Sequence, residues 1–168
     1  MVGSGTVNSE SFKVATPSDH EIRLTRLFNA PRRLVFEAMT KPEHVRQWWG
    51  RLGEGYSVPV CEIDLRPGGT WRFVNRHPKG EAAFHGEYRE ITPPSRLVFT
   101  EIFEQFPDTV SVVTSEFSEE GSQTRLIVTV RYPSPQVREM VMASGMAKGA
   151  GASYDRLEDL VANLQQQA

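Results

Sequence analysis

One carboxylate stands in an apolar segment, where its chemistry would differ from that of a surface acid. Residues 97–103 read Leu-Val-Phe-Thr-Glu-Ile-Phe, so one residue separates Glu101 from Phe99 and one separates it from Phe103. In a strand these three side chains would share a face. If that face is the inner one, burial would raise the pKa of Glu101 and make it a candidate polar anchor or acid/base group, with Tyr88 as a second candidate. Val98, Thr100 and Ile102 alternate with these residues and could occupy the inner face instead, so the sequence leaves both arrangements open.

The remaining reactive residue types show no arrangement typical of a metal or nucleophilic site. The four histidines are His20, His44, His77 and His85, and no two have a spacing that would aim both imidazoles at one ion. No Gly-x-Ser-x-Gly sequence marks a serine nucleophile, and no Gly-x-Gly-x-x-Gly or Walker sequence indicates a nucleotide cofactor. The single cysteine, Cys61, excludes an internal disulfide and is typical of a small buried apolar residue. We therefore expect no metal and no cofactor.

Composition limits the class of protein and the kinds of partner. The chain has 168 residues, 39% of them hydrophobic, and a formal net charge of -2 at pH 7. A domain of this size buries roughly 70% of its unfolded surface, enough core to enclose a cavity. The near-neutral charge argues against nucleic acid as a partner, and no apolar run is long enough for membrane insertion. We expect a cytoplasmic monomer or homodimer, with residues 1–19 a flexible tail and residues 20–168 a single domain.

The pattern along the chain predicts a strand, two short helices, a run of strands and a long final helix. Residues 20–28 alternate apolar and charged side chains, and residues 31–49 have the apolar spacing of two short helices. Five turn sequences then separate six strands: Pro67-Gly68-Gly69, His77-Pro78-Lys79-Gly80, Thr92-Pro93-Pro94-Ser95, Phe106-Pro107-Asp108 and Glu119-Glu120-Gly121-Ser122. Tight connections without intervening helices indicate antiparallel strands.

The final helix is predicted from Ser134-Pro135, a cap and first-turn pair, because apolar residues then recur every three or four positions as far as Leu164. Its middle contains Gly145 and further small residues, which are poor helix formers. Either the helix starts or breaks near Gly145, or the small residues make room for something above the sheet.

Turn chemistry and face polarity together predict the register of the first hairpins. A three-residue loop at the Pro-Gly-Gly turn would place Leu65 opposite Trp71. In the next hairpin, pairing Phe73 with Phe84 places Gly86 opposite Trp71, where the missing side chain leaves room for the indole. The inner face would then carry Cys61, Ile63, Leu65, Trp71, Phe73, Phe84, Gly86 and Tyr88.

Several motifs, taken together, resemble those of one superfamily. They are Phe28-Asn29-Ala30-Pro31, Trp48-Trp49-Gly50, Asp64-Leu65-Arg66-Pro67-Gly68-Gly69-Thr70-Trp71-Arg72, Gly86-Glu87-Tyr88-Arg89-Glu90-Ile91, Pro93-Pro94-Ser95-Arg96-Leu97-Val98-Phe99-Thr100, Gly145-Met146 and Asp155-Arg156-Leu157. From about residue 20 to about residue 164 the chain resembles the SRPBCC (START-like) superfamily. Within it, the chain is similar to the branch named after the C-terminal domain of the activator of the 90-kDa heat-shock-protein ATPase. The resemblance implies an α+β helix-grip fold, as in the birch-pollen allergen: a curved antiparallel sheet of about seven strands around a long C-terminal helix, with two short helices after the first strand.

The resemblance also implies a mostly apolar cavity between the sheet and the long helix, which relatives use for lipids, hormones, polyketides and other hydrophobic small molecules. On this basis the expected cavity residues are Trp48, Trp49, Trp71, Phe73, Phe84, Tyr88, Phe99, Glu101, Phe103, Met146, Ala150, Ser153 and Leu157. The chain departs from the family at two places, because relatives often have Gly-Trp at Gly149-Ala150 and Trp at Glu101. Both changes would make the cavity larger and more polar.

Three functional hypotheses follow from these observations. The first is a binding protein, rather than an enzyme, whose partner is a small hydrophobic or amphipathic molecule. The second is an enzyme of the cyclase or hydrolase type that uses Glu101 or Tyr88 in the cavity. The third and weakest is a chaperone ATPase co-factor, since few residues precede His20 to form another domain.

Overall fold

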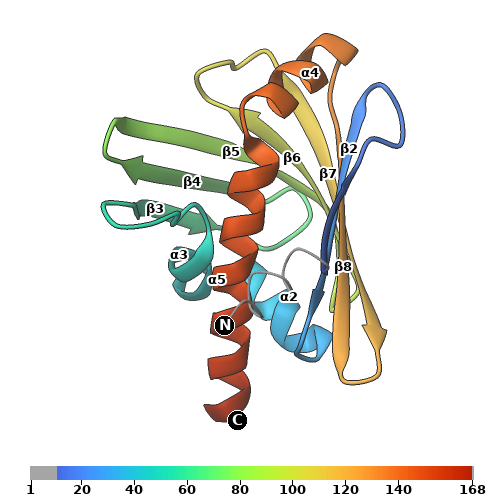
Figure 1. Ribbon diagram of the computed structural model, residues 1–168. Coiled ribbons are helices and arrows are strands. Elements are labelled where there is room, and N and C mark those ends of the chain that lie inside the picture. The colour runs from blue at the N-terminus through green and yellow to red at the C-terminus, as the bar shows by residue number, and fades with distance from the viewer. Residues whose placement is uncertain (1–10, 168) are drawn as a thin grey trace.

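The computed structural model describes residues 11–167, which form one curved antiparallel sheet and four helices (Figure 1). The strands are β1 Phe12–Ala15, β2 Glu21–Phe28, β3 Ser57–Ile63, β4 Thr70–His77, β5 Gly80–Thr92, β6 Arg96–Phe103, β7 Val110–Glu120 and β8 Gln123–Arg131. The helices are α2 Arg32–Thr40, α3 Pro42–Trp48, α4 Pro135–Ala143 and α5 Met146–Gln167. The predicted helix-grip fold is confirmed.

The sheet order is β1-β2-β8-β7-β6-β5-β4-β3, so the six strands after α3 form the predicted meander. Short turns join them because each turn sequence contains proline or glycine. The first long strand, β2, is not beside the strand that follows it in sequence. It pairs with β8, with Glu21 opposite Arg131 and Phe28 opposite Thr124.

The final helical segment is divided at Gly145, which confirms the first of the two interpretations left open by the sequence. Gly145 has a φ of 84°, a conformation that a side chain disfavours, and it separates α4 from α5. The Ser134 hydroxyl caps α4 by accepting a hydrogen bond of 3.2 Å from the backbone N–H of Val137. Ser134 thus starts α4, and Gly145 makes the sharp turn between the two helices.

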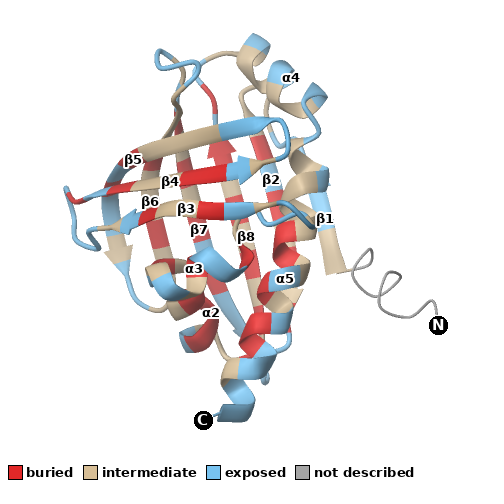
Figure 2. Cartoon of the chain, turned by 90° about the vertical axis from the view of Figure 1, so that its left-hand side faces the viewer, coloured by how far each residue is buried: buried red, intermediate tan, exposed pale blue. Residues whose placement is uncertain are grey.

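Helix α5 crosses one face of the sheet, here called the inner face, and packs most closely against α2, α3 and β2. Its buried side chains are Ser153, Tyr154, Leu157, Leu160 and Val161. They join the inner residues of the sheet in a single core, visible as the buried segments of Figure 2. The lower half of α5 is therefore held firmly, while α4 has no fully buried residue.

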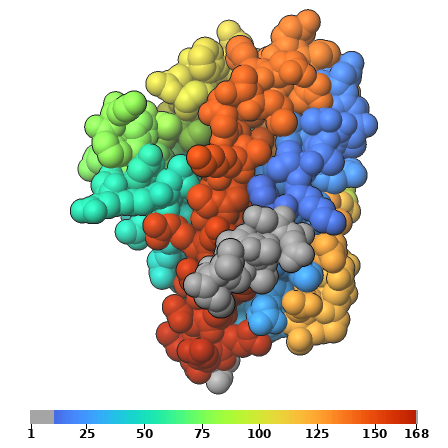
Figure 3. All heavy atoms as spheres, in the orientation of Figure 1, coloured from blue at the N-terminus to red at the C-terminus, as the bar shows by residue number. Residues whose placement is uncertain are grey.

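Strand β1 adds an eighth strand to the sheet and lies inside the segment expected to be a flexible tail. Phe12–Ala15 pairs with β2, with Phe12 opposite Arg26. A Cβ added at Gly151 of α5 would lie 3.2 Å from the Phe12 ring, so the small residue there accommodates β1. In Figure 3 the blue N-terminal strands lie beside the orange C-terminal helices. The sheet thus begins earlier than residue 20, because Phe12–Ala15 pairs with β2 and the Phe12 ring lies close to Gly151 of α5. The part of the expected tail before residue 11 lies outside the described residues.

The predicted register of β3 and β4 is wrong by two residues. The structure pairs Ile63 with Trp71 and Cys61 with Phe73. The connecting loop is longer than three residues, because the backbone N–H of Asp64 bonds to the carbonyl of Thr70 at 2.9 Å. A shift of two preserves each residue's face, so only Leu65 moves from the inner face to an exposed loop.

The predicted register of β4 and β5 is confirmed, with Trp71 opposite Gly86 and Phe73 opposite Phe84. The pairing of β5 with β6 sets Tyr88 opposite Phe99, so Phe99 and Phe103 of β6 lie on the inner face. Of the two arrangements that the sequence left open, the structure has the one in which Glu101 points inward.

Candidate ligand-binding site

A row of aromatic rings covers the inner face of β4, β5 and β6. The ring centroids of Trp71 lie 4.8 Å from those of Phe73 and 5.6 Å from those of Phe99. Phe84 stacks on Phe103 at 4.9 Å. These distances are typical of favourable offset and edge contacts, so the rings form one continuous apolar surface.

This aromatic surface is only partly covered by the helices. The side chains of Phe73, Phe84, Phe99 and Phe103 keep intermediate exposure, although they point to the same side of the sheet as the buried core. The closest packing of α5 is against α2, α3 and β2 rather than against β4 to β6. Apolar area on the inner face is therefore left accessible beside α5.

Helices α4 and α5 border the same region with flexible and small side chains. Met142, Met146 and Ala150 are half-buried and pack against the core that includes Trp71. Methionine side chains adapt to irregular shapes because they are unbranched and polarisable. Two of the expected cavity residues, Met146 and Ala150, thus pack against the core from α5.

Gly86 lets the Trp71 indole lie flat against the sheet. A Cβ at Gly86 would overlap the backbone carbonyl of Thr100 and approach Trp71 Nε1 to 2.8 Å. The indole Nε1 instead donates a hydrogen bond of 3.2 Å to the Thr100 carbonyl. Trp71 is 4% exposed, so this bond fixes the largest ring of the row and satisfies its polar atom.

Glu101 points into this aromatic region from β6. Burial raises its pKa to about 7, because removal from water disfavours the charged form. Its negative charge in turn contributes to the raised pKa values of Tyr132 and Tyr154, which therefore lie nearby. Among residues 11–167 no side chain donates a hydrogen bond to the Glu101 carboxylate, and the Ser111 hydroxyl bonds to its backbone carbonyl instead.

Tyr88 is buried beside Phe99, with an edge contact of 5.9 Å between the rings. Burial raises the pKa of its phenol well above the usual range, so the hydroxyl stays protonated at neutral pH. Cys61 lies on the same face and is buried, and desolvation raises the pKa of its thiol to about 11. The thiol is therefore unreactive, as expected for a small core residue.

The two adjacent tryptophans have different environments. Trp48 is 5% exposed, and its Nε1 donates a hydrogen bond of 2.9 Å to the carbonyl of Ala38. Trp49 is half-buried and extends the aromatic row, with centroids 5.2 Å from Phe73 and 5.5 Å from Phe84. The structure thus places Trp48 in the core and Trp49 at the candidate site.

Two expected cavity residues of α5 lie in close packing instead of beside the aromatic row. The Ser153 hydroxyl accepts a hydrogen bond of 3.2 Å from the backbone N–H of Gly50. Leu157 has no exposed surface. Both residues hold α5 to its neighbours, and neither presents accessible area.

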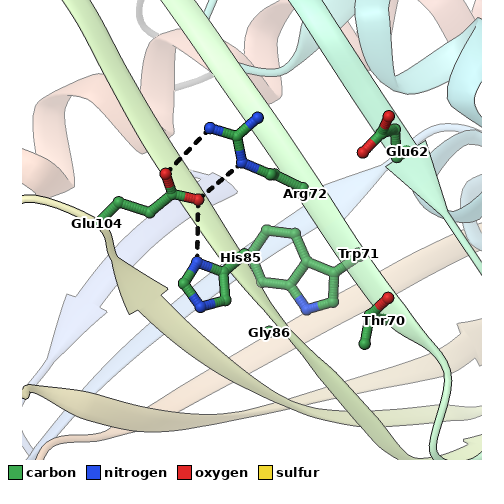
Figure 4. A pocket seen from close by; sticks show the side chains of 7 residues that line it. All are labelled: Glu62, Thr70, Trp71, Arg72, His85, Gly86 and Glu104. Atoms are coloured by element: carbon green, nitrogen blue, oxygen red, sulfur yellow. Dashed lines mark hydrogen bonds and ion pairs between the residues drawn. The ribbon is translucent and has the colours of Figure 1, made fainter. Parts of the chain in front are cut away.

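The opposite, outer face of the sheet carries a shallow hollow of about 310 Å³ above an ionic cluster (Figure 4). The Glu104 carboxylate accepts two hydrogen bonds from Arg72, of 2.8 and 3.0 Å, and lies 2.9 Å from Nδ1 of His85. These hydrogen bonds, led by that from Arg72, hold the pKa of Glu104 at about 2. Arg72 and His85 alternate with the predicted inner-face residues of β4 and β5, but sequence reasoning missed Glu104, which continues the outward positions of β6 just past its end.

Two other kinds of site find no support in the described part of the chain. No group of three or more His, Cys, Asp or Glu side chains within residues 11–167 could hold a metal ion. None of the helices described is long and apolar enough to cross a membrane. The candidate site is therefore the aromatic inner surface with Glu101.

Solved structures with the same fold come from several bacteria. A Rhodobacter sphaeroides protein is 25% identical with a TM-score of 0.82, and the match covers 91% of this chain and 99% of that one. A Mycobacterium smegmatis protein is 25% identical with a TM-score of 0.79, covering 89% and 95%. A Nitrosomonas europaea protein is 25% identical with a TM-score of 0.77, covering 90% and 99%.

The family comparison covers most of the domain. No curated protein matches the chain. The model of the family described as Activator of Hsp90 ATPase homolog 1-like protein matches residues 29–162, from the end of β2 to the last turns of α5. This range contains the aromatic row and Glu101. The chain belongs to the Activator of Hsp90 ATPase homolog 1-like family.

Proposed function

We propose that this protein binds a hydrophobic or amphipathic small molecule on the inner aromatic surface, between β4 to β6 and the helices α4 and α5. The observation that carries the proposal is the intermediate exposure of Phe73, Phe84, Phe99 and Phe103 on the core side of the sheet. Accessible aromatic side chains on a concave inner face gain free energy when a ligand covers them, at roughly 25 cal/mol per Å².

The walls of this region suit an apolar guest of variable shape. The sheet side is rigid, because the Trp71 indole is anchored to the Thr100 carbonyl and packs against the rings of Phe73 and Phe99. The helix side offers the adaptable Met142 and Met146, which respectively precede and follow the Gly145 turn. A rigid aromatic floor with an adaptable wall favours recognition by apolar contact.

Binding is tested with N-phenyl-1-naphthylamine, a neutral dye whose fluorescence rises in apolar surroundings. We expect saturable binding by the wild-type protein and a loss of about tenfold in affinity in Phe84→Ser, since that change removes apolar contact area. Leu65→Ser is the matched control, because Leu65 is 40% exposed in a loop away from the aromatic row. Absence of saturable binding, or equal affinity in Phe84→Ser, would overturn the proposal.

Acid/base catalysis in the same place is the second candidate function. It is favoured by the inward orientation of Glu101 and by its pKa of about 7, which suits proton transfer near neutral pH. The protonated Tyr88 could serve only as a donor. Turnover of an ester or polyketide-like substrate that disappears in Glu101→Gln, while dye binding persists, would establish this function over simple binding.

A further inference from the structure

Resting on the proposed function, we further propose that the preferred ligand carries a protonated amine, and that Glu101 pairs with it inside the aromatic region. Such a ligand would have an apolar body on the rings and a cationic nitrogen at the carboxylate. The inference names the chemical class of the ligand and assigns Glu101 the role of selecting it.

The Glu101 carboxylate lies among aromatic rings, and Ser111, directly opposite on β7, donates its hydroxyl to the Glu101 backbone carbonyl instead. The β5–β6 register pairs Phe84 with Phe103 and Tyr88 with Phe99, which brings Gly86 opposite Glu101. Because Gly86 has no side chain, the nearest side chain across from Glu101 on β5 is the indole of Trp71, which lies over Gly86. Phe99 and Phe103 flank the carboxylate along its own strand.

Charged groups elsewhere in the interior are already engaged with one another. Arg26, on the inner side of β2, is 1% exposed and donates a hydrogen bond of 2.9 Å to Asp155 of α5. Toward Glu101, the segment just after β8 presents Tyr132 and α5 presents Tyr154, and both phenols are neutral because their pKa values are raised. Burial is what shifts the pKa of Glu101, and no cation in the described chain lowers it. Glu101 keeps intermediate exposure, so a ligand can reach it, and a carboxylate with little water around it gains stability as an ion when it is paired. A cationic ligand would supply that missing charge.

The surrounding aromatic rings also favour a positively charged ligand. An aromatic face carries partial negative charge and attracts an ammonium group placed over it, with Trp the strongest of the rings. Trp71 and the phenylalanines beside Glu101 therefore reinforce the carboxylate. A ligand carboxylate would meet repulsion from both, so a fatty acid is the disfavoured class and a neutral alcohol is intermediate.

Three compounds with the same apolar body separate these classes: 4-phenylbutylamine, 4-phenylbutan-1-ol and 4-phenylbutyrate. Quenching of tryptophan fluorescence reports binding to the full chain, since Trp49 and Trp71 line the site. At pH 8 we expect the amine to bind about tenfold or more tightly than the alcohol, and the alcohol more tightly than the acid. Between pH 8 and pH 6 the amine should lose up to about tenfold in affinity, because free Glu101 takes up a proton that must be released on pairing.

The variant Glu101→Gln keeps the shape and removes the charge. It should bind the alcohol as the wild type does and lose the preference for the amine. Glu87→Gln is the matched control, since Glu87 is exposed on the outer side of β5, and it should keep the preference. Equal binding of amine and alcohol by the wild type, or a preference that persists in Glu101→Gln, would overturn this inference and leave the proposed function standing. Failure of all three compounds and of the neutral dye to bind would overturn both.

Discussion

The indole of Trp71 reaches across Gly86 to bond with the backbone carbonyl of Thr100, so a side chain from β4 is tied to β6 over the intervening β5. This single relationship sets the floor of the candidate site. It requires a residue without a Cβ at the crossing point, and it brings the rings beside Trp71 into register with Glu101.

Substitution of Gly86 by alanine should destabilise the fold by about 3 kcal/mol or more, because the new methyl group overlaps the Thr100 carbonyl, which is rigid backbone. Urea unfolding measures the change. Gly53→Ala is the control, since a Cβ there meets nothing within 4 Å, and it should alter the free energy of unfolding by less than about 0.5 kcal/mol. A small effect at Gly86 would mean that the indole does not lie against the sheet as described.

The free energy of unfolding should depend on pH through the ionisation of Glu101. Its pKa is raised from 4.5 to about 7 on folding, so the folded state holds a proton that the unfolded state releases between these values. The contribution of protonated Glu101 is complete below about pH 4.5 and is lost as the pH rises through 7. Glu101→Gln should therefore be more stable than the wild type at pH 8 by about 1–3 kcal/mol, and nearly equal to it at pH 4.

Unfolding of both proteins in urea at the two pH values provides this comparison, with Glu87→Gln as a control that should show no such trend. An advantage for Glu101→Gln that is equal at both pH values would contradict the raised pKa of an unpaired carboxylate.

The outer cluster should show the opposite pH trend. The pKa of Glu104 is lowered to about 2, so its ion pair stabilises the fold fully above about pH 4.5 and less as the pH falls toward 2. Glu104→Gln should lose at most about 1 kcal/mol at pH 7, because Arg72 and His85 are both partly exposed. Urea titrations at pH 7 and pH 3 should show the difference shrinking at the lower pH. A loss that grows on acidification would disprove the assignment.

Phe12 should contribute to stability although it lies before the first long strand. Its ring contacts Tyr154 of α5 at 6.1 Å between centroids and occupies the space above Gly151. Phe12→Ala should cost about 1–3 kcal/mol by thermal or urea unfolding, whereas Lys13→Ala, which alters an exposed side chain of the same strand, should cost almost nothing. Equal effects of the two changes would mean that β1 does not support α5.

The strand registers show which pairings can be predicted from local sequence patterns and which cannot. The β4–β5 pairing was predictable, because Gly86 is the only residue of its segment that leaves room for Trp71 when Phe73 faces Phe84. The β3–β4 pairing was not, because the loop glycines bond to β5: the N–H of Gly68 donates to the Tyr88 carbonyl at 2.8 Å. That bond joins segments far apart in sequence, and no turn rule contains it. The predicted inner face of these strands was still correct, because a register shift of two residues leaves each side chain on the same face of the sheet.

The amino-acid sequence by itself determined the element order, the antiparallel meander and the inner-face aromatic residues of β4 and β5, and it left a break near Gly145 as one of two interpretations. Each of these depends on turn residues or on a short period along the chain, so it can be read locally. Tertiary structure alone decided the direction of Glu101, the packing of β1 on Gly151, the separation of Trp48 from Trp49 and the bonding of Glu104 to Arg72. Each of these depends on which distant segment lies opposite a residue, and a local pattern does not contain that information.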